Sequence, residues 1–420
     1  MKQYLFLLCA MGLLMPSAFG QKEADPQDEF TAKVDAIVED GIRKQAFPGA
    51  QVLVAHKGKV VLHKTYGFHT YDSIVPVAAD HLYDLASVTK ILGPLPALMK
   101  LVEEGKLDLD APFSTYWTPW RKREDKRSLT LREILAHQAG LQPYIVFLND
   151  VLRGEHPKRR FVRTRSSKRF GKKAYADRFI ANRFDRHMYR KINASPVGEK
   201  TYRYSGLTFL VFPKLIEDLT GMPYEAYLRQ GFYDPIGATT LGYLPNERDL
   251  PNPIIPTEQD TLFRKALVKG WVHDENAALL GGVSGNAGLF GTANDVYRMM
   301  QCYQNLGEFN GQRLFEEATV RSFITIQFPE NENRRGLGFD KPLIGNDTLN
   351  VAQAYPAPKA SAMSFGHAGF TGTFAWADPE HQLTFIFLSN RVYPTRANRN
   401  LYELAIRPRL HQLCYDYFVD

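Results

Sequence analysis

Hydrophobic residues recur at helical spacing in "DEFTAKVDAIVEDGIRK", which covers residues 28–44. Phe30, Val34, Val38 and Ile42 follow one another at intervals of four residues. Because residues at this interval share one face of a helix, we expect an amphipathic helix that turns this face toward a core.

Two other stretches alternate apolar and polar residues with a period of two, the spacing of a strand with one buried face. The first, "GAQVLVAHKGKVVLHKTYGF", turns at Lys57-Gly58, and the second, "GTFAWADPEHQLTFIFLSN", turns at Asp378-Pro379. Each predicts a β-hairpin, and helical periodicity fills the chain between them. We therefore expect an α/β (α+β) fold, with an antiparallel sheet built from N- and C-terminal segments, flanked by helices, and an inserted, mostly helical subdomain.

The segment "ASVTKILGPLPALMKLVEEG", residues 86–105, has a helical pattern that contains two prolines. An interior proline costs about 3 kcal/mol or more, so Pro94 and Pro96 predict a kink or a break after the first turn. Further along the chain, "LTLREILAHQAGL" predicts a helix that Thr130 caps and Gly140 closes.

The order of these elements gives the expected domain organisation. Sheet-forming segments occupy about residues 30–85 and 290–420, and the helical subdomain occupies about residues 86–289. Residues 1–20 are instead expected to be a signal peptide, with a lysine near the start, an apolar core and the small residues "SAFG" at the end. The mature domain, residues 21–420, is therefore predicted to be periplasmic or secreted, with no stable membrane anchor after cleavage.

Composition adds little beyond a globular domain, because 44% hydrophobic and 23% charged residues are ordinary proportions. Cleavage of the signal peptide would leave two cysteines, Cys302 and Cys414. Their number excludes a disulfide framework, and their spacing matches no metal site. Buried free thiols are the favoured interpretation, and a single bridge between the two is the alternative.

The formal net charge of +7 is concentrated in residues 150–191, which include "HPKRRFVRTRSSKRFGKK". We call this stretch the basic insertion. A run of this kind attracts anionic glycans, lipid head groups or an acidic substrate, and contact with an anionic glycan is expected here. The alternative is a solvated insertion loop. No recognition motif accompanies the run, so no nucleic-acid partner is expected.

A candidate nucleophile lies in "YDLASVTKIL", where Ser87 and Lys90 are three residues apart. A serine hydroxyl is a weak nucleophile and needs a neighbouring base. On a helix the two side chains would share a face, and a lysine in apolar or cationic surroundings can lose its proton and accept that of a serine. A helix start also directs free backbone N–H groups toward a bound anion. The alternative is a helix-capping serine beside a solvent-facing lysine.

A serine acylation site also needs a second proton-transfer group and donors for an oxyanion. The stretch "YRYSGLTF" offers Tyr204, a phenol just before a helical segment, and "SFGHAGFTGTF" offers His367 at the threshold of a strand. Each residue also has a structural interpretation, Tyr204 as an interface aromatic and His367 as an edge-strand residue.

Together and in this order, the three stretches resemble the serine β-lactamase and penicillin-binding-protein superfamily, and within it the class C β-lactamase-related serine hydrolases. That superfamily carries Ser-x-x-Lys, then Tyr-x-Asn or Tyr-Ser-Asp, then Lys-Thr-Gly or His-x-Gly. Here the motifs are Ser87-Val-Thr-Lys90, Tyr204-Ser205-Gly206 and His367-Ala368-Gly369. The likeness runs from about residue 30 to the C-terminus apart from the basic insertion, and it implies a β-lactamase/transpeptidase-like fold.

The resemblance also implies roles for particular residues. Ser87 would be acylated, Lys90 would accept or relay its proton, and Tyr204 would act as general base and acid. His367 would orient a substrate carboxylate or assist the proton relay. The oxyanion hole would consist of the backbone N–H groups of Ser87 and Phe370. This chemistry requires no cofactor and no metal.

The third motif ends at Gly369, and the resemblance implies that this residue lies on the substrate-binding side of the site. The second motif departs from the family pattern at its last position. Gly206 stands where the family has Asn or Asp, whose side chain hydrogen-bonds the substrate amide and the lysine, so strong β-lactamase activity is not expected.

The resemblance implies D-amino-acid peptides of the cell wall, esters or β-lactams as substrates, hence a small-molecule or peptidoglycan-derived partner. The alternative is a catalytically silent cell-wall-binding or sensor protein on the same fold.

Other catalytic motifs are absent from the sequence. The stretch "GGVSGNAG" has the wrong spacing around Ser284 for a Gly-x-Ser-x-Gly elbow, and no His-Glu-x-x-His pattern or phosphate-binding loop occurs. "VHDEN", residues 272–276, contains metal-ligand residue types, but adjacent residues point in different directions, so a structural turn is expected. His137 follows a helical apolar pattern and is expected to be a packed, hydrogen-bonded histidine.

Overall fold

The computed structural model describes residues 26–419. The predicted signal peptide, residues 1–20, lies outside the described residues and stays a prediction. Within residues 26–419, no helix has the length and apolar character that crossing a membrane would require.

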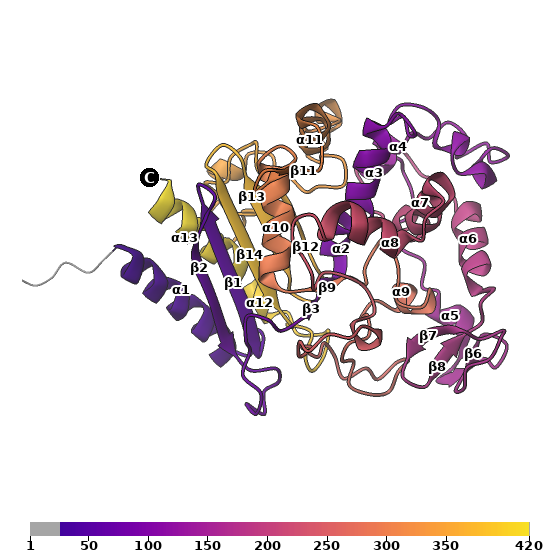
Figure 1. Ribbon diagram of the computed structural model, residues 1–420, viewed down its shortest axis with the longest axis horizontal. Helices are drawn as coiled ribbons and strands as arrows, with labels where there is room; N and C mark the ends of the chain where they lie inside the picture. The colour runs from indigo at the N-terminus through magenta and orange to yellow at the C-terminus, as the bar shows by residue number, and fades with distance from the viewer. Residues whose placement is uncertain (1–25, 420) are drawn as a thin grey trace, which may run out of the picture.

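The centre of the molecule is a five-stranded antiparallel sheet with the strand order β12-β13-β14-β1-β2 (Figure 1). Its strands are β1 (Gly49–His56), β2 (Lys59–Gly67), β12 (Phe365–Ala368), β13 (Phe374–Asp378) and β14 (Leu383–Ser389). Both predicted hairpins are present. Lys57 and Gly58 have φ angles of 49° and 74°, and this left-handed backbone suits the tight turn between β1 and β2. Because β1 pairs with β14, the sheet joins the first and last parts of the sequence.

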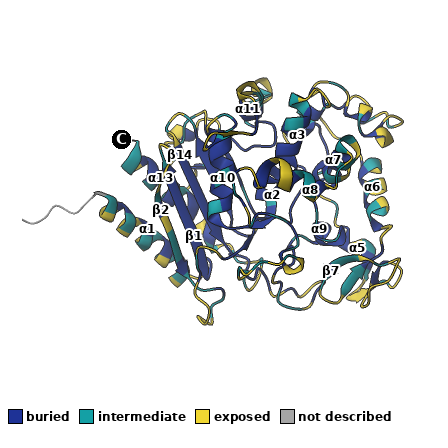
Figure 2. Cartoon of the chain, viewed as in Figure 1, coloured by how far each residue is buried: buried dark blue, intermediate teal, exposed yellow. Residues whose placement is uncertain are grey.

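Helices cover both faces of this sheet (Figure 1). α1 (Pro26–Arg43) and α13 (Ile406–Phe418) cover one face, and α10 (Ala293–Gln304) covers the other. Alternate residues of β1 enter the two cores, Val52 on the α1 side and Leu53 on the α10 side. The central strands and much of α10 are accordingly buried (Figure 2). The predicted N-terminal amphipathic helix is thus confirmed as α1.

A largely helical region lies between the two parts of the sheet in sequence. Its helices are α2 (Thr89–Leu92), α3 (Pro94–Glu103), α4 (Leu131–Leu135), α5 (Leu148–Val151), α6 (Phe184–Ala194), α7 (Phe212–Thr220), α8 (Tyr224–Leu228) and α9 (Glu275–Leu279). The remaining helices are α11 (Glu317–Ile324) and α12 (Asn400–Glu403), and short strands elsewhere are β3 (Tyr83–Asp84), β9 (Phe290–Gly291), β10 (Glu308–Phe309) and β11 (Gln312–Arg313).

Three local predictions in this region can be compared with the structure. The predicted break after the first turn is confirmed, because Gly93 separates α2 from α3. Thr130 caps α4 as expected, in a capping box with Glu133. The predicted end of that helix is wrong, since α4 stops at Leu135 and not at Gly140. His137 has a φ angle of 57°, a left-handed conformation that cannot continue a helix.

The basic insertion is folded, so its interpretation as a solvated loop is wrong. It contains β4 (Leu152–Arg153), β5 (His156–Pro157), β6 (Val162–Arg163), β7 (Lys172–Tyr175), β8 (Arg178–Ile180) and the start of α6. The last three strands form a sheet in the order β6-β8-β7. Phe161, Ile180 and Phe184 are buried beneath this small sheet and α6. Their apolar burial holds the charged surface in a fixed shape.

Both cysteines in the described part of the chain are free and buried, as favoured from the sequence. Cys302 lies in α10 and Cys414 in α13, on opposite faces of the sheet. Burial raises the pKa of the Cys302 thiol to about 12 and raises the pKa of Cys414 as well. Neither thiol has the thiolate character that reactivity requires.

Candidate active site

Ser87 lies in a short 3₁₀ turn that leads into α2. The turn is held from its N-terminal side, because Asp84 Oδ1 accepts the Ala86 N–H at 2.9 Å and Asp84 Oδ2 accepts the His273 N–H at 2.7 Å. Ala86 has a φ angle of 46°, which is an unfavourable conformation for a residue with a Cβ atom. The hydrogen bonds to Asp84 hold this strained backbone in place and so fix the position of the Ser87 side chain.

Lys90 is the nearest amine to the Ser87 hydroxyl. Its Nζ donates to Ser87 Oγ at 3.0 Å and to the Asn286 carbonyl oxygen at 2.9 Å. The side chain is only 2% exposed, so the predicted solvent-facing alternative is wrong for this lysine. Sequence reasoning did not identify Asn286 as its second partner. Asn286 lies in the glycine-rich stretch "GGVSGNAG", which matches no catalytic motif, so nothing in the sequence pointed to its carbonyl oxygen.

Tyr204 reaches the same hydroxyl from a distant part of the chain. Its phenol donates to Ser87 Oγ at 3.4 Å, and Lys90 Nζ lies 5.4 Å from its ring centroid. Burial by itself raises the pKa of the Tyr204 phenol, but the charge and hydrogen bonding of Lys90 outweigh burial, and Ser87 and Arg335 add to them. The pKa of Tyr204 therefore lies below its ordinary value, which favours the phenolate as a base.

His137 and Arg335 hold the Tyr204 ring in place. The His137 ring lies 4.6 Å from the Tyr204 ring, and its Nδ1 accepts the Ser205 N–H at 3.3 Å. The expected packed, hydrogen-bonded histidine is therefore confirmed. Arg335 is 1% exposed, and its guanidinium lies 5.8 Å from the Tyr204 ring centroid. Arg335 was not found from the sequence, because nothing in "NRRGLG" indicates burial.

His367 lies on β12, with its ring 6.0 Å from that of Tyr204. Its Nδ1 lies 2.7 Å from the Ala368 carbonyl oxygen, which can only accept, so Nδ1 carries the proton. Burial lowers the pKa of His367 well below its ordinary value, and the positive charges of Arg335 and Lys90 lower it further. The imidazole is therefore neutral. Its Nε2 is a buried acceptor with no hydrogen-bond partner among residues 26–419.

The loop from β12 to β13 is tied to the segment before Ser87. Thr371 Oγ1 donates to the Asp84 carbonyl at 2.8 Å, and Thr373 Oγ1 donates to the Leu85 carbonyl at 2.9 Å. A Cβ atom at Gly369 would overlap Thr373 Oγ1 and the Leu85 carbonyl oxygen. Only glycine permits this close approach, and the approach brings the third motif beside the serine.

A cavity of about 410 Å³ opens directly on Ser87. It is lined by Ala86, Ser87, Tyr144, Val146, Leu148, Leu262, His273, Asp274, Glu275, Asn286, Ala287, Phe370 and Arg396. The apolar part of this lining comes from the segment before the basic insertion and from Leu262 and Phe370. Most small-molecule sites combine an apolar lining of this kind with a few polar groups. Ser87 and Phe370, whose backbone N–H groups were expected to bind an oxyanion, both line it.

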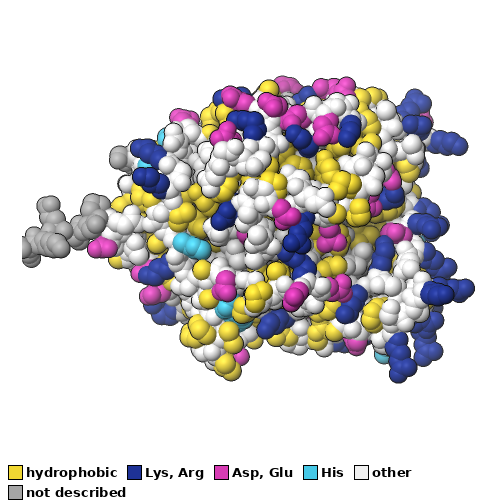
Figure 3. Space-filling view, viewed as in Figure 1, with side chains coloured by type: hydrophobic (Ala, Val, Ile, Leu, Met, Phe, Trp, Pro, Cys, Tyr) yellow, Lys and Arg dark blue, Asp and Glu magenta, His cyan; other side chains and the backbone are white. Residues whose placement is uncertain are grey.

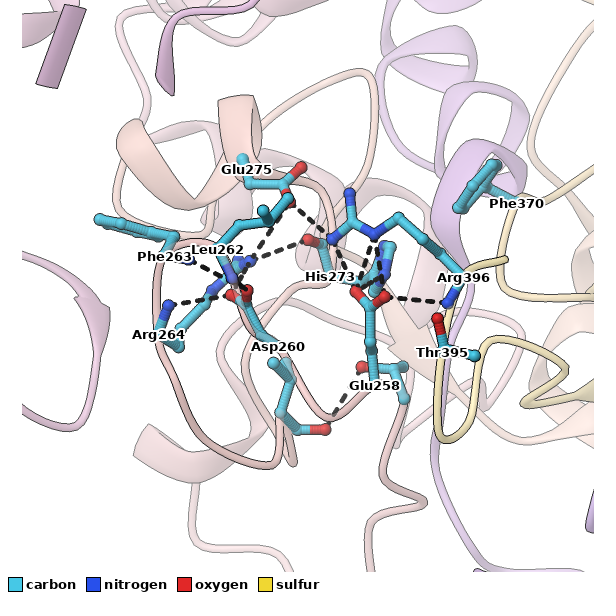
Figure 4. Close-up of polar contacts among 12 residues, drawn as sticks. Glu258, Asp260, Leu262, Phe263, Arg264, His273, Glu275, Phe370, Thr395 and Arg396 are labelled. Atoms are coloured by element: carbon cyan, nitrogen blue, oxygen red, sulfur yellow. Dashed lines mark hydrogen bonds and ion pairs between the residues drawn. The ribbon is translucent and has the colours of Figure 1, made fainter. Parts of the chain in front are cut away.

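The polar wall of the cavity is a closed network of ion pairs (Figure 4). Arg396 donates to Glu258 from Nη2 at 2.6 Å and from Nε at 2.9 Å, and to Glu275 from Nη2 at 2.7 Å. His273 Nε2 lies 2.9 Å from Glu258 Oε2. Burial raises the pKa of Glu258, but the hydrogen bonds from His273 and Arg396 outweigh burial and lower it to about 2. This network holds the wall beside Phe370, whose ring is stacked on that of His273 with 5.7 Å between the ring centroids.

The stretch "VHDEN" is a helix start, which agrees with the predicted structural turn. Asp274 caps α9, because its Oδ1 accepts the Ala277 N–H at 2.8 Å. Among residues 26–419, no group of three or more metal-binding side chains could hold an ion. The sequence did not show that Asp274 and Glu275 also line the cavity beside Ser87.

Gly206 has free space around it, in contrast to Gly369. A Cβ atom at Gly206 would meet no atom within 4 Å. We therefore expect Gly206→Asn to fold normally and to acylate faster with a penicillin, because an amide side chain at this position can hydrogen-bond the substrate amide. The measurement is the rate of penicillin adduct formation by intact-protein mass spectrometry.

A matched glycine substitution controls this experiment. Gly369→Ala introduces one atom where none fits, so it should displace the loop that carries Phe370 and reduce the acylation rate by roughly 10²–10³-fold, as loss of an oxyanion donor does. A Gly206→Asn variant that acylates no faster than the wild type, at an unchanged unfolding temperature, would show that the missing amide does not limit acylation.

Comparison with known proteins places this fold and site in a class. The family model described as Beta-lactamase matches residues 34–407. A protein of Salmonella gallinarum, provisionally named a D-alanyl-D-alanine carboxypeptidase, is 29% identical over 376 residues, which is 84% of this chain and 81% of that protein.

Solved structures show the same fold at lower identity. A penicillin-binding-protein homologue from Caulobacter crescentus has a TM-score of 0.65 at 20% identity, covering 93% of this chain and 98% of the other. The D-amino acid amidase from Ochrobactrum anthropi SV3 has a TM-score of 0.61 at 15% identity, covering 92% and 99%.

Fold and relatives together define a serine hydrolase of the β-lactamase and D-alanyl-D-alanine peptidase type. The chain belongs to the beta-lactamase family, whose model spans most of its length. The resemblance and the β-lactamase/transpeptidase-like fold expected from the sequence are therefore confirmed.

Proposed function

We propose that this protein is an exported serine hydrolase that forms an acyl-enzyme on Ser87. The observation that carries the proposal is the convergence of two groups able to transfer protons, Lys90 Nζ at 3.0 Å and Tyr204 OH at 3.4 Å, on one serine oxygen beside a cavity. An activated serine requires a base within hydrogen-bonding reach, and two distant segments supply proton-transfer groups here.

The proposed reaction has two acyl-transfer steps. The Ser87 proton passes to the Tyr204 phenolate, directly or through Lys90, while Oγ forms a bond to the substrate carbonyl carbon. The backbone N–H groups of Ser87 and Phe370 hold the oxyanion. Collapse breaks the bond to the leaving amine or alcohol, which takes its proton from Tyr204. Water then attacks the acyl group, with Tyr204 again as base, and releases the acid and free Ser87.

His367 is proposed to assist the proton relay and not to bind a substrate carboxylate by charge. Its imidazole is held neutral by burial and by the nearby cations, as its lowered pKa shows. Its free Nε2 is an acceptor, and an acceptor cannot hydrogen-bond a carboxylate oxygen. An acceptor beside the Tyr204 ring can instead assist the relay by accepting a hydrogen bond, which orients a water molecule without protonating the imidazole.

The proposed substrates are D-amino-acid peptides of the cell wall, with esters as the second class. The name of the Salmonella relative supports the first class. β-Lactams remain a third substrate class, which the glycine at position 206 makes poor. The proposed location is the periplasm or the medium, supported by the signal-peptide pattern in residues 1–20.

The direct test is covalent labelling of the full mature chain. A fluorophosphonate or a labelled penicillin should add one adduct mass to the wild type and none to Ser87→Ala, because the adduct forms on Oγ. Turnover of a D-alanyl dipeptide against a short-chain ester then separates peptidase from esterase. Well-folded wild-type protein that takes up neither reagent would favour the catalytically silent binding or sensor protein.

A further inference from the structure

The basic insertion concentrates arginine on one edge of the molecule. Residues 150–191 contain ten arginines and five lysines against four acidic residues. In Figure 3 these cations line the right-hand edge of the protein, where Figure 1 places β6 and α6. A merely soluble surface does not need this excess of arginine over lysine. Arginine is the cation suited to paired hydrogen bonds with carboxylate and phosphate groups.

The acidic residues of the insertion neutralise only one of these ten arginines, Arg178, which pairs with Asp177. The other three acidic residues pair with lysines: Asp150 with Lys191, Glu155 with Lys265 and Asp185 with Lys172. Nine exposed arginines have no ion pair within the part of the chain that the structure describes: Arg153, Arg159, Arg160, Arg163, Arg165, Arg169, Arg183, Arg186 and Arg190. Their positive charge is therefore available to a partner.

The arginines line a connected series of hollows. A hollow of about 500 Å³ beside β5 and a hollow of about 460 Å³ beside α6 share Arg160. The second shares Arg186 and Arg190 with a third hollow, of about 360 Å³, beside Trp117. Because they share lining residues, these hollows adjoin one another, and we call the row that they form the trough. A trough of this form suits a linear chain that carries a charge at each repeat.

Several of these guanidinium groups are pre-positioned. Arg160 lies 4.6 Å from the ring centroid of Phe161, and Arg190 Nη2 lies 3.4 Å from His187 Nδ1. His187 is in turn 3.1 Å from Asp150. Side chains held in this way lose less conformational entropy when they bind an anion.

The surface fits a polymer better than it fits a bilayer or a single-stranded nucleic acid. No large hydrophobic residue between 150 and 191 is exposed. A membrane-surface element normally presents apolar side chains for insertion, and a single-stranded nucleic acid needs exposed aromatic faces on which bases stack. Charge complementarity without such apolar groups favours a hydrated polyanion.

We propose that the trough bounded by Arg160, Arg186 and Arg190 is a binding site for a linear anionic glycan that carries carboxylate or phosphate groups. The site is separate from the cavity at Ser87, since the two share no lining residue. It anchors the protein on an envelope polymer while the cavity faces its substrate. The proposal stands whether or not Ser87 is acylated.

The test compares two variants that each lose three positive charges. Arg160→Gln/Arg186→Gln/Arg190→Gln removes cations that line the trough, and the control Lys57→Gln/Lys59→Gln removes two exposed cations from the β1–β2 hairpin, at the opposite side of the molecule in Figure 1. Adding Arg43→Gln, at the end of α1 on that same side, matches the charge change.

The full mature chain is titrated with alginate, a linear polyuronate, and with linear polyphosphate, at several salt concentrations. The trough variant should bind at least about tenfold more weakly, and the slope of log affinity against log salt should fall by about two, because each lost contact releases fewer counterions. The control should bind like the wild type. Turnover at Ser87 and the unfolding temperature should stay unchanged in both variants.

Preference between the two polymers identifies the anionic group, and binding of either supports the proposal. Equal binding by the trough variant and the control would overturn it. Tighter binding to phosphatidylglycerol vesicles or to a single-stranded oligonucleotide than to both polymers would also overturn it, because the partner would then be a membrane or a nucleic acid.

Discussion

Replacing Lys90 by methionine is expected to reduce acylation of Ser87 by roughly 10²–10⁴-fold, the usual contribution of one proton-transfer group. Lys90 Nζ is the buried donor 3.0 Å from Ser87 Oγ. Methionine has a similar length and suits an apolar site, so the substitution removes the amine with little change in packing. It leaves the Asn286 carbonyl without this donor, which costs roughly 1–3 kcal/mol of stability.

Lys90→Met should also move the pH dependence of the remaining activity. The pKa of the Tyr204 phenol is raised by burial and lowered more strongly by Lys90, so loss of the lysine should raise that pKa. If the phenolate is the base, activity falls as the pH drops through the pKa of Tyr204. The acid limb of kcat/KM should therefore shift to higher pH in the variant.

Stopped-flow acylation with an activated ester, measured across pH, checks both effects. Ser87→Ala is the reference for background hydrolysis, and thermal unfolding confirms that each variant is folded. A folded Lys90→Met variant that acylates at the wild-type rate, with an unshifted acid limb, would remove Lys90 from the proposed mechanism.

Tyr204→Phe is expected to lower kcat/KM by a similar factor, roughly 10²–10⁴-fold. The phenol oxygen lies 3.4 Å from Ser87 Oγ, and phenylalanine keeps the ring contacts with His137 and Arg335 while removing only the hydroxyl. Tyr204 is 36% exposed, so the loss should fall on the chemistry and only slightly on the unfolding temperature.

The pH profile distinguishes a base from a packing residue. In the wild type, the phenolate persists to lower pH than an ordinary tyrosine allows, because Lys90 lowers the pKa of Tyr204 more than desolvation of the phenol raises it. The acid limb of kcat/KM should therefore lie below the pKa of about 10 of a free phenol, and Tyr204→Phe should abolish that limb. The variant Tyr202→Phe removes a neighbouring exposed phenol and serves as the control. An acid limb that survives in Tyr204→Phe would assign the base to another group.

Much of the fold could be read from local pattern. The helix α1, both hairpins and the break at Gly93 follow from spacing, alternation and proline chemistry within short windows. The residues at which elements end were harder to predict from the sequence, and α4 is an example. The helix cannot continue through His137, whose backbone is left-handed, and the His137 ring is hydrogen-bonded to the Ser205 N–H, far along the chain.

The basic insertion shows the same limit at the level of a subdomain. Its charge suggested a solvated loop, because charged residues dominate the sequence there. Only a few apolar residues, such as Phe161 and Phe184, decide that it folds. Their spacing along the chain fits no single helix or strand, so their common burial depends on strand pairing that a local window does not contain.

The sequence by itself determined the family of this protein and the candidate reactive groups, since Ser87, Lys90, Tyr204 and His367 each sit in a short motif whose spacing is local. Only the tertiary structure decided the hydrogen-bond partners, the neighbouring charges and hence the protonation of those groups. Three features come from segments far apart in the chain: the Asn286 carbonyl on Lys90, the Arg335 charge that helps keep His367 neutral, and the ion-paired wall at Glu275. The physical reason is that protonation and recognition depend on distance and burial in space, and neither quantity is carried by residue spacing.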